Sequence, residues 1–491
     1  MAVSFNSIPA KVLTPFFYAE VDNSQANTTS ESMQTLLIGP KLAAGTAAVL
    51  EVVPVSSAED AADLFGAGSV LHRAVAAYRD GDSSGMLYVL PVNDPEAGVA
   101  GAKPVTISGT ATEAGTLSLY IGEELVQVPV AAQDNAAAIA TAAAAAVNAD
   151  TSLPCTAAAA EGVLTLTAKH KSLVGADFAV NVNLLGKTNG QTLPAGVGVS
   201  FGEGTSGAGV YDLEPAFKAL KDEPYEFIGL FFDDATAWNA AKSAMAARWD
   251  YAAQLYGHCY TAKRGTVDAL VTAAKAQNDP HLTLFGVSET DPNGVAERLG
   301  ATIAQVAVSI RADPARPLQT LVLTGIPAPR QSDRFERDER EMLLTGGVAT
   351  YTDTSSGTQI ERAVTTYTKN AQGAADNSYQ DSETLHTLGY VLRFLRSRLT
   401  SKYGRHKLAS DGTSFGEGQA VVTPKIIRSE LIAAYSELET AGLVENTALF
   451  KKYLVVERDA TDPNRINVLF PPDLVNQLRI LAVLAQFRLQ Y

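Results

Sequence analysis

Cysteine is almost absent from this chain of 491 residues, which contains only Cys155 and Cys259. The two lie far apart and neither belongs to a CxxC pair, so the pattern excludes a disulfide framework and a zinc ribbon. The six histidines form no HxH or HxxxH pair that could begin a metal site. We therefore expect a protein of a reducing compartment, with no bound metal.

The sequence also lacks long apolar runs. No segment approaches the roughly 18 continuous apolar residues of a membrane span, and residues 1–25 lack the basic flank and apolar stretch of a secretory signal. The formal net charge of −15 disfavours a surface that broadly binds nucleic acid or anionic lipid. We expect a soluble chain without direct contact to a membrane or to nucleic acid.

Catalytic patterns are missing as well. Residues 39–46, Gly-Pro-Lys-Leu-Ala-Ala-Gly-Thr, follow an apolar run but lack the lysine that precedes the threonine of a phosphate loop. Without such a loop, Asp233 and Asp234 indicate a helix N-cap rather than a magnesium site. His258 and Cys259 are neighbours on an expected strand, so their side chains point to opposite faces and cannot act as base and nucleophile. The sequence predicts no catalytic, cofactor or metal site, and hence no enzyme.

The chain does contain a regular alternation of short apolar runs and amphipathic segments. Residues 34–39 and 86–91 have the length and composition of buried strands, and residues 69–78 between them have helical spacing. The same rhythm returns later, with strands expected at 227–232, 257–261, 281–287 and 318–326 and helices at 235–254, 266–277 and 293–311. It predicts an α/β core whose mixed, mostly parallel sheet is covered on both faces.

Between these two parts the composition changes abruptly. Residues 103–205 are rich in alanine, glycine, threonine and valine and poor in aromatic and charged residues. Strands are expected at 116–121, 125–130, 163–167 and 178–182, the first two as a hairpin. Asp134 is expected to cap an alanine-rich helix, and the glycine-rich residues 202–209 to form a flexible seam. The pattern predicts a small β-rich domain inserted into the core.

From residue 347 the pattern changes to an α+β arrangement. Its expected elements are a hairpin of 348–351 with 360–367, helices at 382–402 and 424–441, and strands at 453–457 and 466–469. The predicted division is a discontinuous core domain at 26–102 and 206–346, an inserted domain at 103–205 and a C-terminal domain at 347–477. Extended N-terminal and C-terminal arms, 1–25 and 478–491, complete it.

Both arms have the patterns of β-prone segments without a partner nearby in the sequence. Pro9 and Pro15 disfavour a helix in the first arm, and the second alternates apolar and polar residues with the period of a half-buried strand. We therefore expect both to pair by strand addition with neighbouring subunits. Their apolar residues are Phe16, Phe17, Tyr18 and Val21 in the first arm and Ala485, Phe487, Leu489 and Tyr491 in the second.

A basic run occupies residues 393–407 of this otherwise acidic chain, and further basic residues open the next expected helix. One interpretation is a solvated helix face. The other is a docking surface for an acidic protein partner, because like-charged subunits need a local patch of opposite sign to associate. The candidates for docking are Lys425, Arg428, Arg393 and Arg396.

Segments spread over the whole chain carry a family resemblance. They are 1–9 and 18–23 near the start, 64–71 with the pattern Phe-Gly-x-Gly-Ser, and 313–319, 405–409, 418–425 and 471–477. As an ordered set they resemble the tail sheath proteins of Mu-type contractile-tailed bacteriophages. The module at 103–205 is the least specific part of the resemblance.

The resemblance implies a structural, non-enzymatic subunit of a virion. Such subunits polymerise as stacked hexameric rings around a tail tube and contract, driving the tube through the host envelope for genome ejection. The arms would exchange strands with adjacent subunits, with the C-terminal domain near the tube and the inserted domain outermost. Expected partners are further copies of the chain, the tail tube protein, and the baseplate and tail terminator proteins, with assembly in the host cytoplasm.

Two other functions stay open. The sheath of a phage-derived bacteriocin or of another contractile injection device would resemble the same family. A nucleotide-using α/β enzyme is a more distant alternative that rests on the alternation of strands and helices alone, because fold does not imply function.

Overall fold

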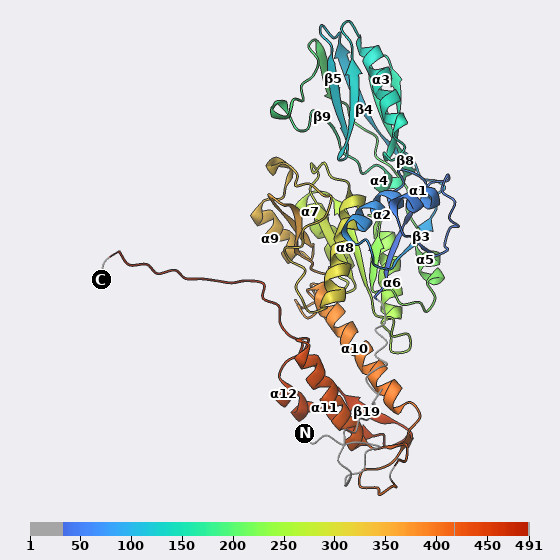
Figure 1. Ribbon diagram of the computed structural model, residues 1–491, viewed down its shortest axis with the longest axis vertical. Helices are drawn as coiled ribbons and strands as arrows, with labels where there is room; N and C mark the ends of the chain where they lie inside the picture. The colour runs from blue at the N-terminus through green and yellow to red at the C-terminus, as the bar shows by residue number, and fades with distance from the viewer. Residues whose placement is uncertain (1–32, 417, 490–491) are drawn as a thin grey trace, which may run out of the picture.

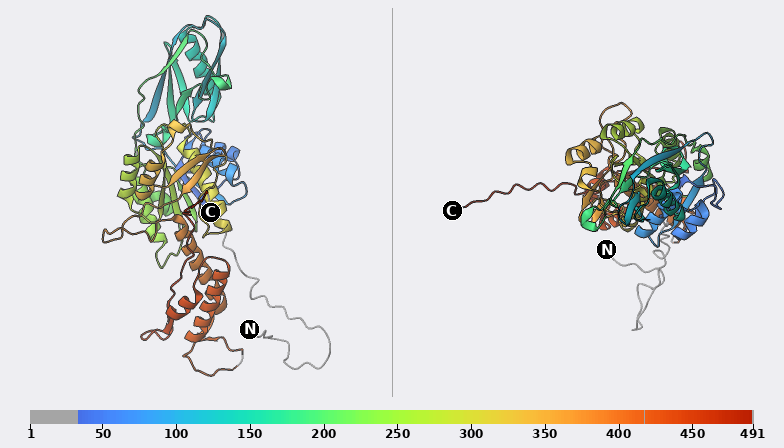
Figure 2. Two further views of the ribbon diagram at one scale, coloured as in Figure 1. Left: turned by 90° about the vertical axis from the view of Figure 1, so that its left-hand side faces the viewer. Right: turned by 90° about the horizontal axis from the view of Figure 1, so that it is seen from above.

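The computed structural model describes residues 33–416 and 418–489 and has an elongated shape with three tiers (Figure 1). The inserted module lies at one end, the α/β core in the middle and a helical C-terminal part at the other end. Figure 2 shows the same tiers from a second side. Phe16, Phe17, Tyr18, Val21 and Tyr491 lie outside the described residues, so their role in the arms stays a prediction.

The core is built on a six-stranded sheet with the order β13-β12-β11-β1-β3-β2. Neighbouring strands run parallel except for β2, which pairs antiparallel with β3. The strands are β1 (Thr35–Pro40), β2 (Val53–Pro54), β3 (Leu87–Val92), β11 (Phe227–Leu230), β12 (His258–Arg264) and β13 (Leu282–Val287). Their apolar sequences suit strands that are buried on both faces. The predicted mixed, mostly parallel sheet is confirmed.

Helices cover both faces of this sheet, in two separate clusters of buried side chains. On one face lie α1 (Ala58–Phe65), α2 (Val70–Gly81) and α8 (Val295–Ala312). On the other lie α5 (Glu214–Ala219), α6 (Ala235–Arg248), α7 (Val267–Gln277) and α9 (Arg337–Thr345). The strand order reverses between β1 and β11, and in doubly wound sheets ligands bind beyond the carboxyl ends of the strands at this point.

One predicted strand of the core is wrong. Residues 318–326 form turns with a single bridge at Val322, and no strand. Leu318, Leu323 and Ile326 are buried in the first cluster, which accounts for the apolar run. The helix predicted at 235–254 also ends earlier, at Arg248.

The inserted module consists of two sheets, β10-β4-β8-β7 and β6-β5-β9, with one long helix packed on them. Its elements are β4 (Ala100–Gly109), β5 (Gly115–Ile121), β6 (Glu124–Val130), α3 (Ala136–Ala149), β7 (Cys155–Ala160), β8 (Val163–Lys171), α4 (Ser172–Gly175), β9 (Val180–Val182), the short 3₁₀ turn Lys187–Asn189 and β10 (Val197–Phe201). The hairpin predicted at 116–130 is β5–β6. Three strands, β4, β7 and β10, were not predicted, and of these β7 is mostly alanine and shows no period.

Two local predictions in the module are corrected. The cap of α3 is Asn135, whose side chain accepts a hydrogen bond of 2.9 Å from the Ala138 amide, whereas Asp134 accepts from Ala131. The seam at 202–209 is paired rather than flexible, since Val99 and Ala208 exchange backbone hydrogen bonds of 2.7 and 2.9 Å. Val99, the pairing partner, lies outside residues 103–205, so the composition of that stretch could not reveal that the seam is paired.

The hairpin β14 (Thr350–Thr354) and β15 (Gly357–Arg362) belongs to the core by its packing. From the sequence, it was predicted to belong to the C-terminal domain. Tyr351 and Ile360 are instead buried in the first core cluster, and Ala349 forms a parallel bridge with Phe285 of β13. The predicted boundary at residue 346 therefore cuts through residues that share one apolar core.

Helix α10 (Ser382–Tyr403) connects the core to the C-terminal tier, at the position predicted for a helix. Val391 and Leu395 near its middle enter a separate cluster with α11 (Pro424–Thr440) and α12 (Thr447–Tyr453). Short strand pairs complete the tier: β16 (Lys407–Leu408) with β17 (Val421–Val422), and β18 (Val455–Arg458) with β19 (Ile466–Leu469). Among the described helices, none combines the length and apolar character needed to cross a bilayer.

Candidate assembly surfaces

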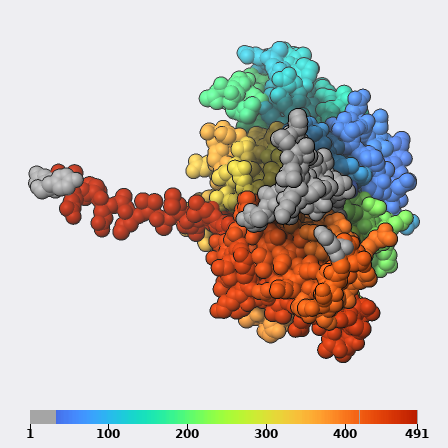
Figure 3. Space-filling model, turned by 60° about the horizontal axis from the view of Figure 1, so that its bottom comes forward, coloured from blue at the N-terminus to red at the C-terminus, as the bar shows by residue number. Residues whose placement is uncertain are grey.

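The C-terminal segment leaves the body of the molecule as an extended chain. Residues 480–489 have no helical or strand assignment and stand clear of the other elements (Figures 1 and 3). Their apolar side chains are uncovered, with Phe487 82 % and Leu489 90 % exposed. Ala485 is exposed as well. Exposed apolar residues of this density mark an interaction segment, because monomeric proteins rarely leave them in water.

The four docking candidates differ in how their side chains are engaged. Lys425 and Arg396 are exposed on α11 and α10. Arg393 forms an ion pair of 2.5 Å with Glu226, and Arg428 donates hydrogen bonds to the carbonyl oxygens of Lys451 and Leu454. Only Lys425 and Arg396 therefore present a charge that a partner could reach without breaking an internal bond.

Part of the basic run on α10 is also neutralised within the chain. Glu430 of α11 is 7 % exposed and forms ion pairs with Arg398 at 2.5 Å and with Lys402 at 2.6 Å. Tyr403 donates to the same carboxylate at 3.1 Å. The interpretation as a solvated face fails here, since these charges hold α10 against α11.

A buried polar network joins α10 to the amino edge of the central sheet. Glu226 accepts hydrogen bonds from His386 at 2.7 Å and from Arg393, and the Tyr260 hydroxyl lies 2.7 Å from the other ring nitrogen of His386. Burial alone would raise the pKa of the Glu226 carboxyl, but the Arg393 charge and the hydrogen bonds from His386 and Arg393 together hold this pKa below its usual value. The network is a structural joint between core and C-terminal tier.

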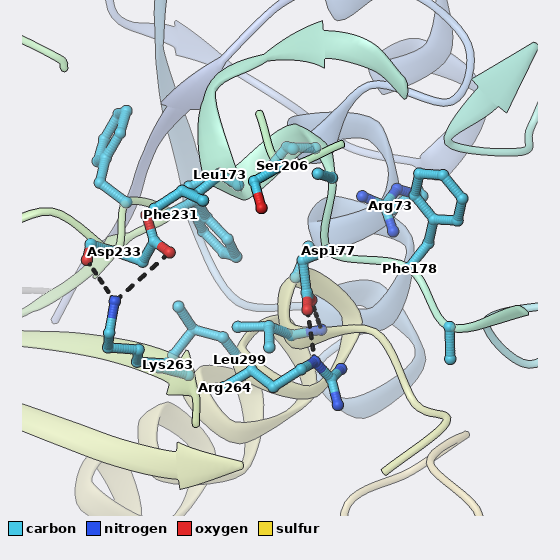
Figure 4. Close-up of a pocket in the computed structure, with 18 of the residues that line it drawn as sticks. Arg73, Leu173, Asp177, Phe178, Ser206, Phe231, Asp233, Lys263, Arg264 and Leu299 are labelled. Carbon is cyan, nitrogen blue, oxygen red and sulfur yellow. Dashed lines mark hydrogen bonds and ion pairs between the residues drawn. The ribbon is translucent and has the colours of Figure 1, made fainter. Parts of the chain in front are cut away.

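The crevice beyond the carboxyl ends of the sheet is where a ligand would be sought, and here the inserted module occupies it (Figure 4). The module supplies Asp177, which accepts hydrogen bonds from Arg264 of β12 at 2.6 Å and from the Val295 amide of α8 at 2.8 Å. Beside this pair, Lys263 lies 3.6 Å from Asp233. Burial would raise the pKa of Asp177, but the Arg264 charge together with the hydrogen bonds from Arg264 and the Val295 amide holds this pKa below its usual value.

A cavity of about 340 Å³ remains between these two ion pairs. Its polar side chains are largely committed to each other rather than aimed at an empty centre. A second anchor lies beside it, where His170 of β8 accepts from the Val70 amide and contacts Asp94 at 2.9 Å. The crevice therefore functions as the seat of the inserted module, a role that the sequence did not signal.

The residues that suggested chemistry in the sequence have other partners. Lys41 donates to the Gly45 carbonyl within its own loop at 2.6 Å, and Asp234 caps α6 through the Ala237 amide, as predicted. His258 lies 2.8 Å from Thr283 and is buried, and Cys155 and Cys259 are buried free thiols. Within 33–416 and 418–489, no three His, Cys, Asp or Glu residues gather as a metal site.

Comparison with known proteins finds sequence matches along nearly the whole chain. The family model of the phage tail sheath protein central domain matches residues 206–366, and that of the phage tail sheath C-terminal domain matches residues 374–488. The Mu-like prophage FluMu tail sheath protein of Haemophilus influenzae is 40% identical over 490 residues, which cover 99% of this chain and 100% of that protein.

Two solved structures show a more distant likeness. The sheath tail protein of Desulfitobacterium hafniense is 11% identical with a TM-score of 0.48, covering 94% of this chain and 100% of that one. The sheath tail protein Lin1278 of Listeria innocua is 13% identical with a TM-score of 0.49, covering 92% and 94%. These values are too low to add to the sequence relationship.

Proposed function

This chain belongs to the phage tail sheath family, and from that premise we propose that its copies polymerise as stacked six-subunit rings around a tail tube. The sheath then contracts and drives the tube through the host envelope. The observation that carries the proposal is the match to a tail sheath protein along nearly the entire chain. The exposed apolar segment 480–489 supports it, because such a segment requires a cover that another copy can supply.

Strand addition is the contact through which neighbouring copies stay joined during contraction. Backbone hydrogen bonds between an arm and a neighbour's sheet edge persist while the globular faces exchange contacts. The short pair β18–β19 of the C-terminal tier offers such an edge. Contraction in this scheme draws on contacts that improve in the contracted state, so it requires no nucleotide.

Deletion of residues 480–491 tests the arm. The shortened chain should stay folded and monomeric, whereas the full chain should form tubes that negative-stain electron microscopy detects. The circular dichroism spectrum of the shortened chain is the control for folding. Tubes formed equally well by the shortened chain would contradict the proposal.

The surface that faces the tail tube is proposed to include Lys425 and Arg396, which are exposed. Their replacement by glutamate should weaken binding to the tail tube while sparing self-assembly, because it reverses the local charge. Arg393 and Arg428 were also candidates, but their changes would break internal bonds first. Tube binding that withstands both charge reversals would rule out this surface.

The place of assembly and the kind of particle follow from the same premise. We place assembly in the host cytoplasm, with baseplate and tail terminator proteins as the partners at the two ends of the sheath. A bacteriocin-like or other contractile device is the second candidate, favoured by nothing in the chain itself. Capsid genes beside the coding sequence would distinguish a virion from such a device.

A further inference from the structure

The C-terminal arm has an anchored root before its free part. Residues 473–475 are all partly buried, and from 475 to 479 partly buried and exposed residues alternate. The backbone bonds to the C-terminal tier, where the Glu445 amide donates to the Asp473 carbonyl at 2.9 Å and the Val475 amide to the Leu443 carbonyl at 3.2 Å. Gln477 then donates to the carbonyl of Ala315, in the loop after α8, at 3.3 Å. From residue 480 onward every side chain is exposed up to residue 489. The transition falls at Arg479.

Arg479 is held by two carboxylates at the start of α10. Its guanidinium lies 2.9 Å from Glu383 and 3.4 Å from Asp381. The Arg479 side chain is 12% exposed and that of Glu383 0%. A planar guanidinium that bridges two fixed carboxylates restricts direction as well as distance. This ion-paired group, Arg479 with Glu383 and Asp381, is termed the clamp.

The carboxylates of the clamp are themselves fixed by the core. Glu383 accepts a hydrogen bond of 2.7 Å from the Leu318 amide, and Asp381 accepts two from Arg362 of β15, at 2.8 and 3.0 Å. The clamp thus joins the arm to the loop after α8, to the hairpin β14–β15 and to the first turn of α10. The arm therefore departs from the core side of the molecule, away from the tier to which it belongs in sequence.

We propose that Arg479 is a positioning residue that sets the direction in which the arm leaves the body and couples the arm to the α/β core. This deepens the proposed function and rests on it, because the arm's acceptor is a second copy of the chain. Because the clamp fixes the direction in which the arm leaves the body, residues 480–489 have less conformational freedom before they pair with the neighbour. Pairing therefore costs less conformational entropy. It also makes a pull on the arm act on the core rather than on the C-terminal helices.

The first experiment measures the direction of the arm in the unassembled full chain. Spin labels are placed at Leu481→Cys, just beyond the clamp, and at Thr272→Cys on the exposed side of α7, while the native cysteines are buried. The distance distribution between the labels should be narrow, and Arg479→Ala should broaden it at least twofold. Arg488→Ala, which removes an exposed arginine farther along the arm, is the matched control and should leave it unchanged.

The second experiment measures the rate of tube formation by light scattering. Arg479→Ala should slow it by about tenfold, as expected when about one further residue must be ordered on pairing, and Arg488→Ala should not. Arg479→Ala leaves the buried carboxylate of Glu383 without its ion-pair partner, which could destabilise the fold. The double variant Arg479→Ala, Glu383→Gln removes the clamp without leaving that buried charge and is therefore measured as well. Arg479→Lys keeps the positive charge but lacks the planar guanidinium, so its rate of tube formation should lie between those of Arg479→Ala and the wild type.

The outcomes separate the clamp from the proposed function. A chain that lacks 480–491 and still forms tubes contradicts the function of the arm. Suppose instead that the deletion prevents tubes, while Arg479→Ala and the double variant match the wild type in label distances and in the rate of tube formation. The clamp proposal is then overturned and the function of the arm stands. Broader distances together with slower assembly support the clamp.

Discussion

At the scale of single residues, the structure separates charges that are free from charges that are used. Arg393 and Arg396 lie three positions apart on one helix, yet Arg393 neutralises the buried Glu226 and Arg396 is exposed. The sequence identified both as basic. It could not rank them, because Glu226 lies far away in the chain.

This pair provides a prediction about stability. Arg393→Ala should lower the midpoint of thermal unfolding by about 5–10 °C, because removing one partner of a buried ion pair costs about 3–5 kcal/mol. Arg396→Ala is the control and should leave the midpoint within about 1 °C. Differential scanning calorimetry measures both, and equal midpoints for the two variants would refute the structural role of Arg393.

Glu123, in the turn between β5 and β6, is the clearest pH-sensitive group. Burial raises the pKa of its carboxyl to about 8, with a further contribution from the charge of Glu297. The oxygen Oε1 of Glu123 has no hydrogen-bond partner among the described residues. The other charged groups that face it are Arg298 and Asp291 of the core and Glu124 of its own turn.

The sign of the pH dependence follows from this raised pKa. Between 4.5, the ordinary pKa of a glutamate side chain, and about 8, the folded chain retains the proton that the unfolded chain has lost, so stability falls as pH rises. Glu123→Gln cannot ionise and should reduce the drop in unfolding temperature between about pH 6 and about pH 9. Glu124→Gln is the matched control on the exposed neighbour. Identical pH profiles for the two variants would exclude Glu123 as the cause.

At the scale of elements, the inserted module is packed against the core through several contacts and is not joined to it by flexible linkers alone. The paired seam and the contacts of Asp177 and His170 tie it to the core at separate points. A Cβ at Gly207 would meet the Ser172 carbonyl oxygen at 1.9 Å, so a glycine is needed where the seam passes α4. The module and the core should therefore move together.

Asp177→Ala tests this seat. Without its carboxylate, the Val295 amide loses its acceptor and Arg264 its partner, so hydrogen exchange at Val295 should accelerate by about tenfold or more. Glu113→Gln, in an exposed turn of the same module, is the control. Unchanged exchange at Val295 would show that the module is held by other contacts alone.

Sequence reasoning worked best for elements with a strong period. The buried strands β1 and β3 and the helices α10 and α11 lie where they were predicted, because long apolar or amphipathic segments carry their own pattern. The failures have two different causes. Residues 318–326 are apolar because they are buried in a loop, and the alanine-rich β7 shows no alternation that the sequence could reveal.

At the scale of the whole molecule, net charge opposes self-association. Each copy carries a formal charge of −15, so copies repel one another at low ionic strength until salt screens them. The apolar arm is insensitive to this screening. Association should therefore depend on salt in a defined direction.

Tube formation should accelerate as NaCl rises from about 0.01 M, where the Debye length is about 30 Å, to about 0.15 M, where it is about 8 Å. Light scattering at fixed protein concentration measures the rate. The chain without residues 480–491 serves as the control and should stay unassembled at both concentrations. Slower assembly in higher salt would indicate that attractive charge pairs between copies dominate instead.

The sequence by itself determined the class of the core, the lack of a catalytic pattern and the β-prone character of the C-terminal arm. These properties depend on local composition and period, which can be seen along the chain. Only the tertiary structure decided which charges are free, where the module is seated and where the arm departs. Those features depend on pairs such as Glu226 with Arg393, Asp177 with Arg264 and Glu383 with Arg479, whose members are distant in sequence and meet only through folding.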